Sequence, residues 1–319
     1  MKRCSCWEEV GVEDRSLTVA ARDGVAARNG AVGRRKLLPH LLAAVLLVSL
    51  SPVFAQTAPA IDPKLPTIFV IGDSTANNNN NRGWGEQFAP YFDLTKVNIV
   101  NRARGGRSSR TFITEGLWES TRKELKPGDY VLIQFGHNDG SAPDQDRARG
   151  SLPGIGEEAQ AFTMPDGREE VVHTFGWYMR KYVADTKEKG ATPIILSLTV
   201  RNIWKDGKVE RGPGRFGEWS AEVAQSEHAA FADLTNAIAD QYEKLGEAKV
   251  KEFFPEDHTH TSPAAADLNA SLVVAVLKGI DSPVAAWLSA KGQAVQAIPA
   301  PRPPMQPPVP ADPKPPGPN

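Results

Sequence analysis

Residues 67–75 read TIFVIGDST, an apolar run that ends in a Gly-Asp-Ser turn. The first six residues combine β-branched and aromatic side chains without polar alternation, which is typical of a strand buried on both faces of a sheet. Similar runs predict strands at 97–100, 129–135 and 192–198, and a weaker run predicts a fifth at 250–254. Buried parallel strands need helices on both faces, so the pattern predicts an α/β fold, a three-layer α/β/α sandwich.

Segments with apolar residues at three- and four-residue spacing lie between these runs, as in helices that pack one face on a sheet. They predict helices at 84–92, 108–125, 175–189, 220–245 and 262–277. In open parallel sheets, binding sites lie beyond the carboxyl ends of the strands. The loops that follow the predicted strands are therefore the places to look for function.

Ser74 follows the first predicted strand directly, behind Gly72 and Asp73. A serine in this position is held at the carboxyl edge of the sheet, where its hydroxyl can act as a nucleophile. The plainer alternative is a turn or a helix cap, because Asp and Ser are favoured in both. The turn alone does not decide between the two interpretations.

The loops after the second and third predicted strands supply hydrogen-bond donors. Gly105 and Gly106 lie in the loop at 104–108, and glycine lets a backbone amide approach a ligand closely. Asn138 lies in the segment at 135–139 and offers a side-chain amide. Three consecutive strands would thus bring a hydroxyl, glycine amides and a carboxamide to one edge of the sheet.

Asp257 and His260 precede the last predicted helix in the segment PEDHTHTS, residues 255–262. Within one turn the carboxylate can fix the tautomer of the imidazole and leave its other nitrogen free as a base. A helix cap is one alternative, and a metal site that uses His258 and His260 is another. No third histidine lies nearby and the only cysteines are Cys4 and Cys6, which disfavours a metal.

Taken together and in this order, four short blocks resemble the SGNH-hydrolase, or GDSL-type esterase, superfamily, and within it the rhamnogalacturonan acetylesterases. The blocks are GDSTA (72–76), GGRS (105–108), GHND (136–139) and DHTH (257–260), and the resemblance covers about 66–279. It implies a flavodoxin-like, roughly five-stranded parallel sheet. Each block is weak alone, but four in order at strand ends form a specific pattern.

The resemblance also implies roles for single residues. Ser74 would be the nucleophile, His260 the general base and Asp257 the carboxylate that orients it. The backbone amides of Ser74 and Gly106 and the side chain of Asn138 would form the oxyanion hole. The implied reaction is a two-step acyl transfer that needs no cofactor and no metal.

An acetylated pectic polysaccharide is the implied substrate and partner. Arg107, Arg110 and Arg201 follow strand ends and are candidate contacts for uronate carboxylates, which guanidinium groups bind well. Trp84 is a candidate for stacking on a sugar ring, although core packing is the usual role of tryptophan. The stretch at 139–172 has little periodicity and is expected to form a lid or specificity loop.

Three other functions remain open from the sequence. One is a lipolytic esterase or lysophospholipase of the same superfamily, against which the five asparagines at 77–81 and the nearby arginines argue, because they leave little apolar surface for a long acyl chain. Another is an acetylxylan-type esterase. The third is a carbohydrate-binding protein that has lost catalysis, which the complete Ser, Gly, Asn, Asp and His set disfavours.

Both ends of the chain differ from its middle. Residues 37–55 combine an apolar run, a basic flank and small residues before the end, as in a signal peptide cleaved near Ala55, although a membrane anchor is the alternative. Residues 1–36 are interpreted as a misassigned or disordered extension, 56–65 as a linker, 66–281 as the esterase domain and 282–319 as a proline-rich disordered tail.

These segments predict a secreted or periplasmic protein without stable membrane insertion after signal removal. The formal net charge is −1, and no basic stripe runs along the sequence. Nucleic acid is therefore not an expected partner. The oligomeric state has no signal in the sequence.

Overall fold

Five parallel strands form the central sheet of the computed structural model, which describes residues 61–300. They are β1 (Thr67–Gly72), β2 (Asn98–Asn101), β3 (Tyr130–Gln134), β6 (Thr192–Leu196) and β9 (Ala230–Ala232). Their order in the sheet is β2-β1-β3-β6-β9. This is the flavodoxin-like order, in which the crevice for a ligand opens between β1 and β3.

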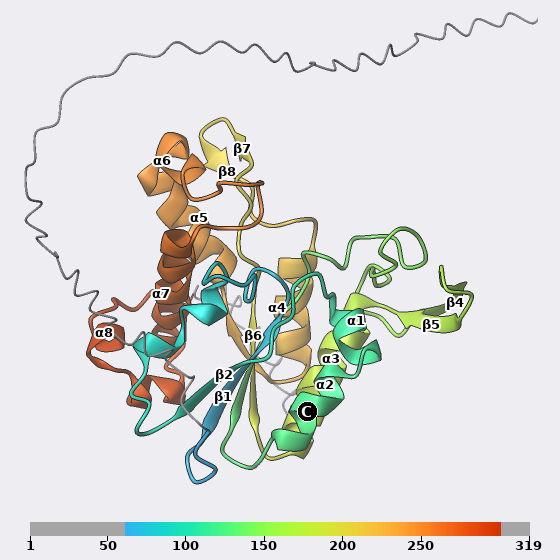
Figure 1. Ribbon diagram of the computed structural model, residues 1–319, viewed down its shortest axis with the longest axis horizontal. Coiled ribbons are helices and arrows are strands. Elements are labelled where there is room, and N and C mark those ends of the chain that lie inside the picture. Colours follow the sequence, from blue (N-terminus) through green and yellow to red (C-terminus); the bar gives the residue numbers. More distant parts are fainter. Residues whose placement is uncertain (1–60, 301–319) are drawn as a thin grey trace, which may run out of the picture. The chain divides into compact units, whose positions relative to one another are not determined.

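Helices cover both faces of the sheet, so the predicted three-layer α/β/α fold is confirmed (Figure 1). One layer comprises α1 (Ser109–Thr114), α2 (Leu117–Glu124), α3 (Phe175–Glu188) and α4 (Phe216–Ser226). The other comprises η1 (Trp84–Glu86), η2 (Ala89–Tyr91), α5 (Leu234–Leu245), α6 (Glu247–Lys251), α7 (Pro263–Gly279), η3 (Pro283–Trp287) and α8 (Ala290–Gln293).

The side chains of β1 divide between two hydrophobic cores, one on each face of the sheet. Ile68 and Val70 belong to the core under α5 and α7, whereas Phe69 and Ile71 belong to the core under α1 to α4. All four are buried. This explains why the strand reads as an unbroken apolar run: neither face meets water.

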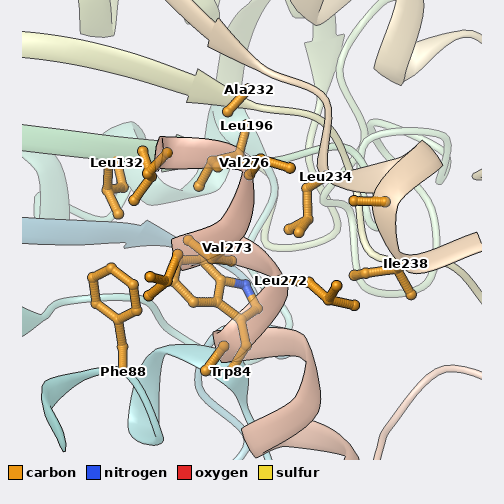
Figure 2. Close-up of a cluster of buried hydrophobic side chains, with 14 of the residues drawn as sticks. Trp84, Phe88, Leu132, Leu196, Ala232, Leu234, Ile238, Leu272, Val273 and Val276 are labelled. Carbon is orange, nitrogen blue, oxygen red and sulfur yellow. The ribbon is translucent and has the colours of Figure 1, made fainter. Parts of the chain in front are cut away.

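Helix α7 forms the centre of the first core. Val273 and Val276 lie among Trp84, Leu132 and Leu196, which come from η1, β3 and β6 (Figure 2). Ten of the seventeen residues of α7 are buried, because the helix is covered by neighbouring segments as well as by the sheet. A helix that is apolar on most sides is typical of such a position.

The fifth strand of the sheet was predicted in the wrong place. Residues 250–254 are not a strand, because α6 ends at Lys251 and a turn follows at 252–253, and β9 lies inside the helix predicted at 220–245. His228, with φ 49°, precedes β9, and the side chain of Asp233 caps α5 directly after it. A three-residue strand between two helices carries too little pattern to be distinguished from helix.

Two more of the five predicted helices are broken, and the remaining two are confirmed. The segment at 84–92 forms the two short turns η1 and η2, and the segment at 108–125 is divided at Gly116, whose φ of 76° ends α1. Glycine adopts this left-handed conformation without steric cost. The helices predicted at 175–189 and 262–277 are confirmed as α3 and α7.

The fold continues beyond the expected domain end at residue 281. Leu288 forms a β-bridge with Phe92, and the backbone N–H of Ile298 donates to the carbonyl of Ala275 at 3.0 Å. The prediction of a disordered tail from 282 is therefore wrong for 282–300. The rest of that tail, residues 56–60 of the linker, the signal segment and residues 1–36 lie outside the described residues.

The insertion at 139–172 is not an unstructured loop throughout. It contains most of a two-stranded hairpin formed by β4 (Ala159–Thr163) and β5 (Glu169–His173), which extends from the α1 and α3 side (Figure 1). A shorter hairpin is formed by β7 (Trp204–Lys205) and β8 (Lys208–Val209). Between residues 61 and 300, no helix has the length and apolar character needed to cross a membrane.

Candidate active site

The turn after β1 is held by Asp73 and leaves Ser74 partly exposed. One carboxylate oxygen of Asp73 accepts hydrogen bonds from the backbone N–H and the hydroxyl of Thr75, both at 2.8 Å. Asp73 is fully buried, whereas Ser74 reaches a cavity. The aspartate of the Gly-Asp-Ser turn therefore shapes the backbone, and the serine is the residue that borders the cavity.

Gln134 supports this turn from below. Its side-chain oxygen accepts hydrogen bonds from the hydroxyl of Thr75 at 3.2 Å and from the indole N–H of Trp84 at 2.8 Å. Its nitrogen donates to the carbonyl of Ser197 at 2.8 Å. Trp84 has no exposed surface, so its predicted stacking on a sugar is wrong, because the indole is part of the core beneath the turn.

Ser74, His260 and Asp257 form one chain of hydrogen bonds. The Nε2 atom of His260 lies 2.8 Å from the Oγ atom of Ser74, and Nδ1 lies 2.6 Å from one carboxylate oxygen of Asp257. The other carboxylate oxygen accepts the backbone N–H groups of Thr259 and His260, both at 2.7 Å. The structure thus brings together the three residues that the sequence singled out.

The carboxylate of Asp257 is held in its ionised form. Burial acts to raise its pKa, but hydrogen bonds from the His260 side chain and from the backbone N–H groups of His260 and Thr259 lower the pKa to about 2. An ionised partner fixes the imidazole tautomer that has its proton on Nδ1. Nε2 is then available to accept the proton of the Ser74 hydroxyl.

Arg82 joins the loop after Ser74 to the loop that carries His260. Its Nε atom donates to the carbonyl of Thr261 at 3.1 Å, and its Nη1 atom lies 2.8 Å from the carboxylate of Glu256. The hydroxyl of Thr261 donates back to the carbonyl of Arg82 at 2.9 Å. No sequence motif pointed to this contact, which holds two segments distant in the chain together.

The asparagine run after Ser74 has a backbone function. Asn79, Asn80 and Asn81 have φ values of 58°, 53° and 61°, and asparagine tolerates the left-handed region better than most residues. The carboxylate of Glu86 accepts the backbone N–H groups of Asn78 and Asn81 at 3.0 and 3.2 Å. The run therefore builds a tight loop, of which Asn78 lines the cavity.

The predicted oxyanion donors border the same cavity as Ser74 and His260. Gly106 has a φ of 80°, and within residues 61–300 neither its N–H nor that of Ser74 donates a hydrogen bond. The carboxamide of Asn138 is fixed because its nitrogen donates to the carbonyl of Arg107 at 2.8 Å. One N–H of that nitrogen is thereby used, and the other is available to a ligand.

Arg107 acts on the peptide unit that carries the Gly106 N–H. Its Nη1 atom donates to the carbonyl of Gly105 at 2.9 Å, and that carbonyl and the Gly106 N–H belong to one planar group, where they point in opposite directions. The guanidinium also forms an ion pair with Glu115 at 2.8 Å. Arg107 is thus placed to orient an oxyanion donor as well as to face the cavity.

The cavity has a volume of about 650 Å³ and is rich in guanidinium groups. Arg107 and Arg201, the predicted substrate contacts, line this cavity. Arg147 and Arg149 line it as well and were not predicted from the sequence. Arg201 also donates to the carbonyl of His137 at 3.3 Å. The only signal for the missed pair is the Arg-Ala-Arg sequence in the insertion after β3.

Arg110 does not line the cavity that contains Ser74, contrary to the prediction. Its side chain is 1% exposed and forms an ion pair with Glu170 of β5 at 3.3 Å. Its Nη2 atom donates to the carbonyl of Pro143 at 3.0 Å and also to that of Ala148. From this buried position Arg110 connects α1 to the loop at 143–148 and to the hairpin.

Two ionisable neighbours of Asn138 are buried and have shifted pKa values. Burial lowers the pKa of His137 to about 4, so its ring is neutral, and Nε2 lies 3.1 Å from the hydroxyl of Thr199. Burial raises the pKa of Asp139 to about 7, against the opposing effect of hydrogen bonds from the side chain and backbone of Ser109. The hydrogen bonds from Ser109 to Asp139 tie the segment after β3 to the start of α1.

No metal site is evident in the part of the chain that the structure describes. Within residues 61–300, no three His, Cys, Asp or Glu side chains converge as metal ligands. His260 uses both ring nitrogens on Ser74 and Asp257, which leaves neither for the alternative metal pair with His258. The arrangement suits proton transfer and nucleophilic attack.

Comparison with known proteins gives a consistent family. The model of the GDSL-like lipase/acylhydrolase family matches residues 70–268. A rhamnogalacturonan acetylesterase of Emericella nidulans is 37% identical over 216 residues, which are 67% of this chain and 86% of that protein. A probable rhamnogalacturonan acetylesterase of Bacillus subtilis, YesY, is 26% identical over 68% of this chain and 94% of its own length.

A solved structure is similar as well. The crystal structure of the Bacillus subtilis protein YxiM superimposes with a TM-score of 0.55 and 25% identity, over 69% of this chain. The matched part spans 58% of the length of YxiM. The fold of the matched part thus recurs in a solved structure.

Proposed function

Because the chain belongs to the GDSL-like lipase/acylhydrolase family and is therefore a carboxylic ester hydrolase, we propose that it is a serine acetylesterase that acts on an acetylated pectic polysaccharide. The observation that carries the mechanism is the hydrogen-bond chain from Ser74 through His260 to Asp257. It has the geometry of a nucleophile, a base and an orienting carboxylate.

In the first step, the Oγ atom of Ser74 attacks the carbonyl carbon of the acetyl ester while Nε2 of His260 takes the hydroxyl proton. The imidazolium that forms is stabilised by the carboxylate of Asp257, which stays ionised. The tetrahedral intermediate then collapses, and His260 gives its proton to the departing sugar oxygen. The products of this step are the free sugar hydroxyl and an acetyl group bound to Ser74.

In the second step, water replaces the sugar. His260 takes a proton from the water, whose oxygen attacks the acetyl carbonyl, and the proton then returns to Oγ of Ser74 as acetate leaves. In both steps the negative charge on the carbonyl oxygen is met by the N–H groups of Ser74 and Gly106 and by the amide of Asn138. Donors aimed at a developing charge are a large source of acceleration.

The substrate is inferred from two observations. The proteins of Emericella nidulans and Bacillus subtilis (YesY) described above carry the names of a rhamnogalacturonan acetylesterase and a probable one. The cavity is lined by four arginines and one glutamate, which suits an ester on an acidic polymer better than a long acyl chain. A lipolytic enzyme would need an apolar slot beside Ser74.

The proposal is tested by acetate release from acetylated rhamnogalacturonan, acetylated xylan and acetylated homogalacturonan, with the wild type and with Ser74→Ala. We expect the fastest release from rhamnogalacturonan and none with the variant. Labelling by a fluorophosphonate should require Ser74. Equal rates on xylan would support the acetylxylan alternative, and activity in Ser74→Ala would contradict the mechanism.

Export is a separate proposal that rests on the sequence at 37–55, which lies outside the described residues. A polysaccharide substrate is compatible with an enzyme outside the cytoplasm. Sequencing the N-terminus of protein recovered from the periplasm or medium should give a start near Gln56. Recovery of the protein only with residues 37–55 still attached would contradict cleavage.

A further inference from the structure

A second cavity adjoins the one that contains Ser74. It has a volume of about 320 Å³ and lies between α1 and the β4–β5 hairpin. The two cavities share Thr111, Glu115 and Arg147 in their walls. A ligand larger than one sugar can therefore extend from Ser74 past Arg147 toward the hairpin.

The two cavities differ in charge. The first has four arginines and one glutamate in its wall, whereas the second has three arginines and four carboxylates. In the second cavity, Arg168 pairs with Glu170 at 2.7 Å and Arg110 pairs with the same carboxylate at 3.3 Å. The first cavity thus favours an anion, and the second has no net positive charge to offer one.

Arg147 stands at the junction and has no carboxylate partner among residues 61–300. Its neighbours Asp146 and Ala148 both have positive φ values, of 53° and 43°, so it occupies a tight, strained loop. The buried side chain of Arg110 bonds to two carbonyl groups of this loop and so holds it in place. Strain that is maintained by buried contacts often marks a binding position.

Arg149 lies two residues after Arg147 and contacts the loop at 104–108, which contains Gly106. Its guanidinium donates to the hydroxyl of Ser141 and to the carbonyl of Gly106, both at 3.3 Å. Burial, followed by repulsion from Arg147, lowers the pKa of Arg149 below its ordinary value. A bound anion would relieve this crowding of positive charge.

We propose that the two cavities are consecutive subsites for an acidic oligosaccharide. The carboxylate of an acetylated uronic acid binds Arg147 and Arg149 in the first cavity, and an uncharged sugar linked to it occupies the second cavity against the hairpin. The inference rests on the proposed function, since it places two neighbouring sugars of the proposed polysaccharide substrate in two positions. The buried pair of Arg110 and Glu170 keeps both positions aligned.

The first subsite is tested with Arg147→Gln and with Arg215→Gln as the matched control, because Arg215 is exposed, pairs with Glu218 and lines neither cavity. For acetylated rhamnogalacturonan oligosaccharides, we expect Arg147→Gln to raise KM about tenfold or more, in line with the loss of a charge-assisted contact. Rates on p-nitrophenyl acetate and KM for acetylated xylo-oligosaccharides should stay unchanged. The control should match the wild type on all three substrates.

The second subsite is tested with Thr114→Trp, which places a large side chain in the second cavity from an exposed position on α1. The KM for oligosaccharides should rise several-fold, whereas the KM for an acetylated methyl galacturonoside should not change. Binding of deacetylated oligosaccharides to Ser74→Ala, measured by calorimetry, should weaken when either substitution is added.

The outcomes separate this inference from the proposed function. If Ser74→Ala abolishes hydrolysis but Arg147→Gln and Thr114→Trp behave as the wild type on every substrate, the function stands and the subsites are wrong. If Arg147→Gln slows p-nitrophenyl acetate as much as oligosaccharides, the arginine acts on the chemistry and not on the uronate. If Ser74→Ala remains active, both proposals fail.

Discussion

Replacing Asn138 with alanine tests the oxyanion hole more directly than any other single change. The side chain is buried and donates one N–H to the carbonyl of Arg107 at 2.8 Å. That bond holds the carboxamide in one orientation, while its second N–H donates no hydrogen bond within residues 61–300. The substitution removes one structural hydrogen bond and one donor for the transition state.

The two losses have different sizes and different readouts. Loss of an oxyanion donor costs roughly 10²–10³ in kcat, or about 3–4 kcal/mol of transition-state stabilisation. Loss of an ordinary hydrogen bond costs about 1 kcal/mol of folding stability, which lowers Tm by roughly 2–4 °C in a domain of this size. KM should change little, because the donor strengthens its contact as charge develops.

The assay is the initial rate on p-nitrophenyl acetate together with thermal unfolding of the same preparation. Asn98→Ala is the matched control, because Asn98 donates to the carbonyl of Asp62 at 2.8 Å at a remote position. The control should lose a few degrees of Tm and keep its kcat. If Asn138→Ala retains kcat within about threefold while folded, our interpretation of the oxyanion hole is wrong.

Three further predictions concern stability and positioning. Arg82→Met should lower kcat about tenfold with KM nearly unchanged, because a charge-assisted bond to the loop of His260 is lost; partial rescue by Arg82→Lys in the same rate assay is expected, and no change in kcat would contradict the positioning role. Asp139→Asn should flatten the pH dependence of folding stability. In the folded protein the carboxyl of Asp139 keeps its proton up to about pH 7, whereas its ordinary pKa is 3.8. The wild type therefore loses stability as the pH rises from about 4 to 7, and the variant should not. Thermal unfolding at pH 5 and pH 8 measures this, and equal slopes in both proteins would rule it out. Arg110→Met should destabilise the fold by about 1–3 kcal/mol in urea unfolding, since it leaves the carbonyl groups of Pro143 and Ala148 without their donor, whereas Glu170 keeps its pair with Arg168; a loss below about 0.5 kcal/mol would show that these contacts contribute little.

The residues at the strand ends could be predicted because their positions follow from local sequence. An apolar run that stops at Gly-Asp-Ser places Ser74 at the sheet edge, and the three-residue spacing of Asp257 and His260 places both side chains within one turn. Their hydrogen bonds at 2.6 and 2.8 Å agree with that expectation. Local structure can be predicted from the spacing of residues that are close together in the sequence.

Burial was the part that the sequence did not reveal. Trp84 and Arg110 are nearly inaccessible, although both follow segments that carry site residues. Whether a guanidinium points into a cavity or under a loop depends on contacts with the hairpin, which lies about 60 residues further along the chain. Arg147 was missed for the same reason, because its loop is shaped by Arg110 rather than by its own sequence.

The nucleophile and the base that activates it are separated by 186 positions along the chain. Closing so long a segment is slow, because contacts distant in sequence form late in folding. A polypeptide released before α7 has docked would have its serine in place but no imidazole to deprotonate it. Recovery of esterase activity during refolding should thus lag behind recovery of helical circular dichroism, and any fragment ending before residue 257 should be inert.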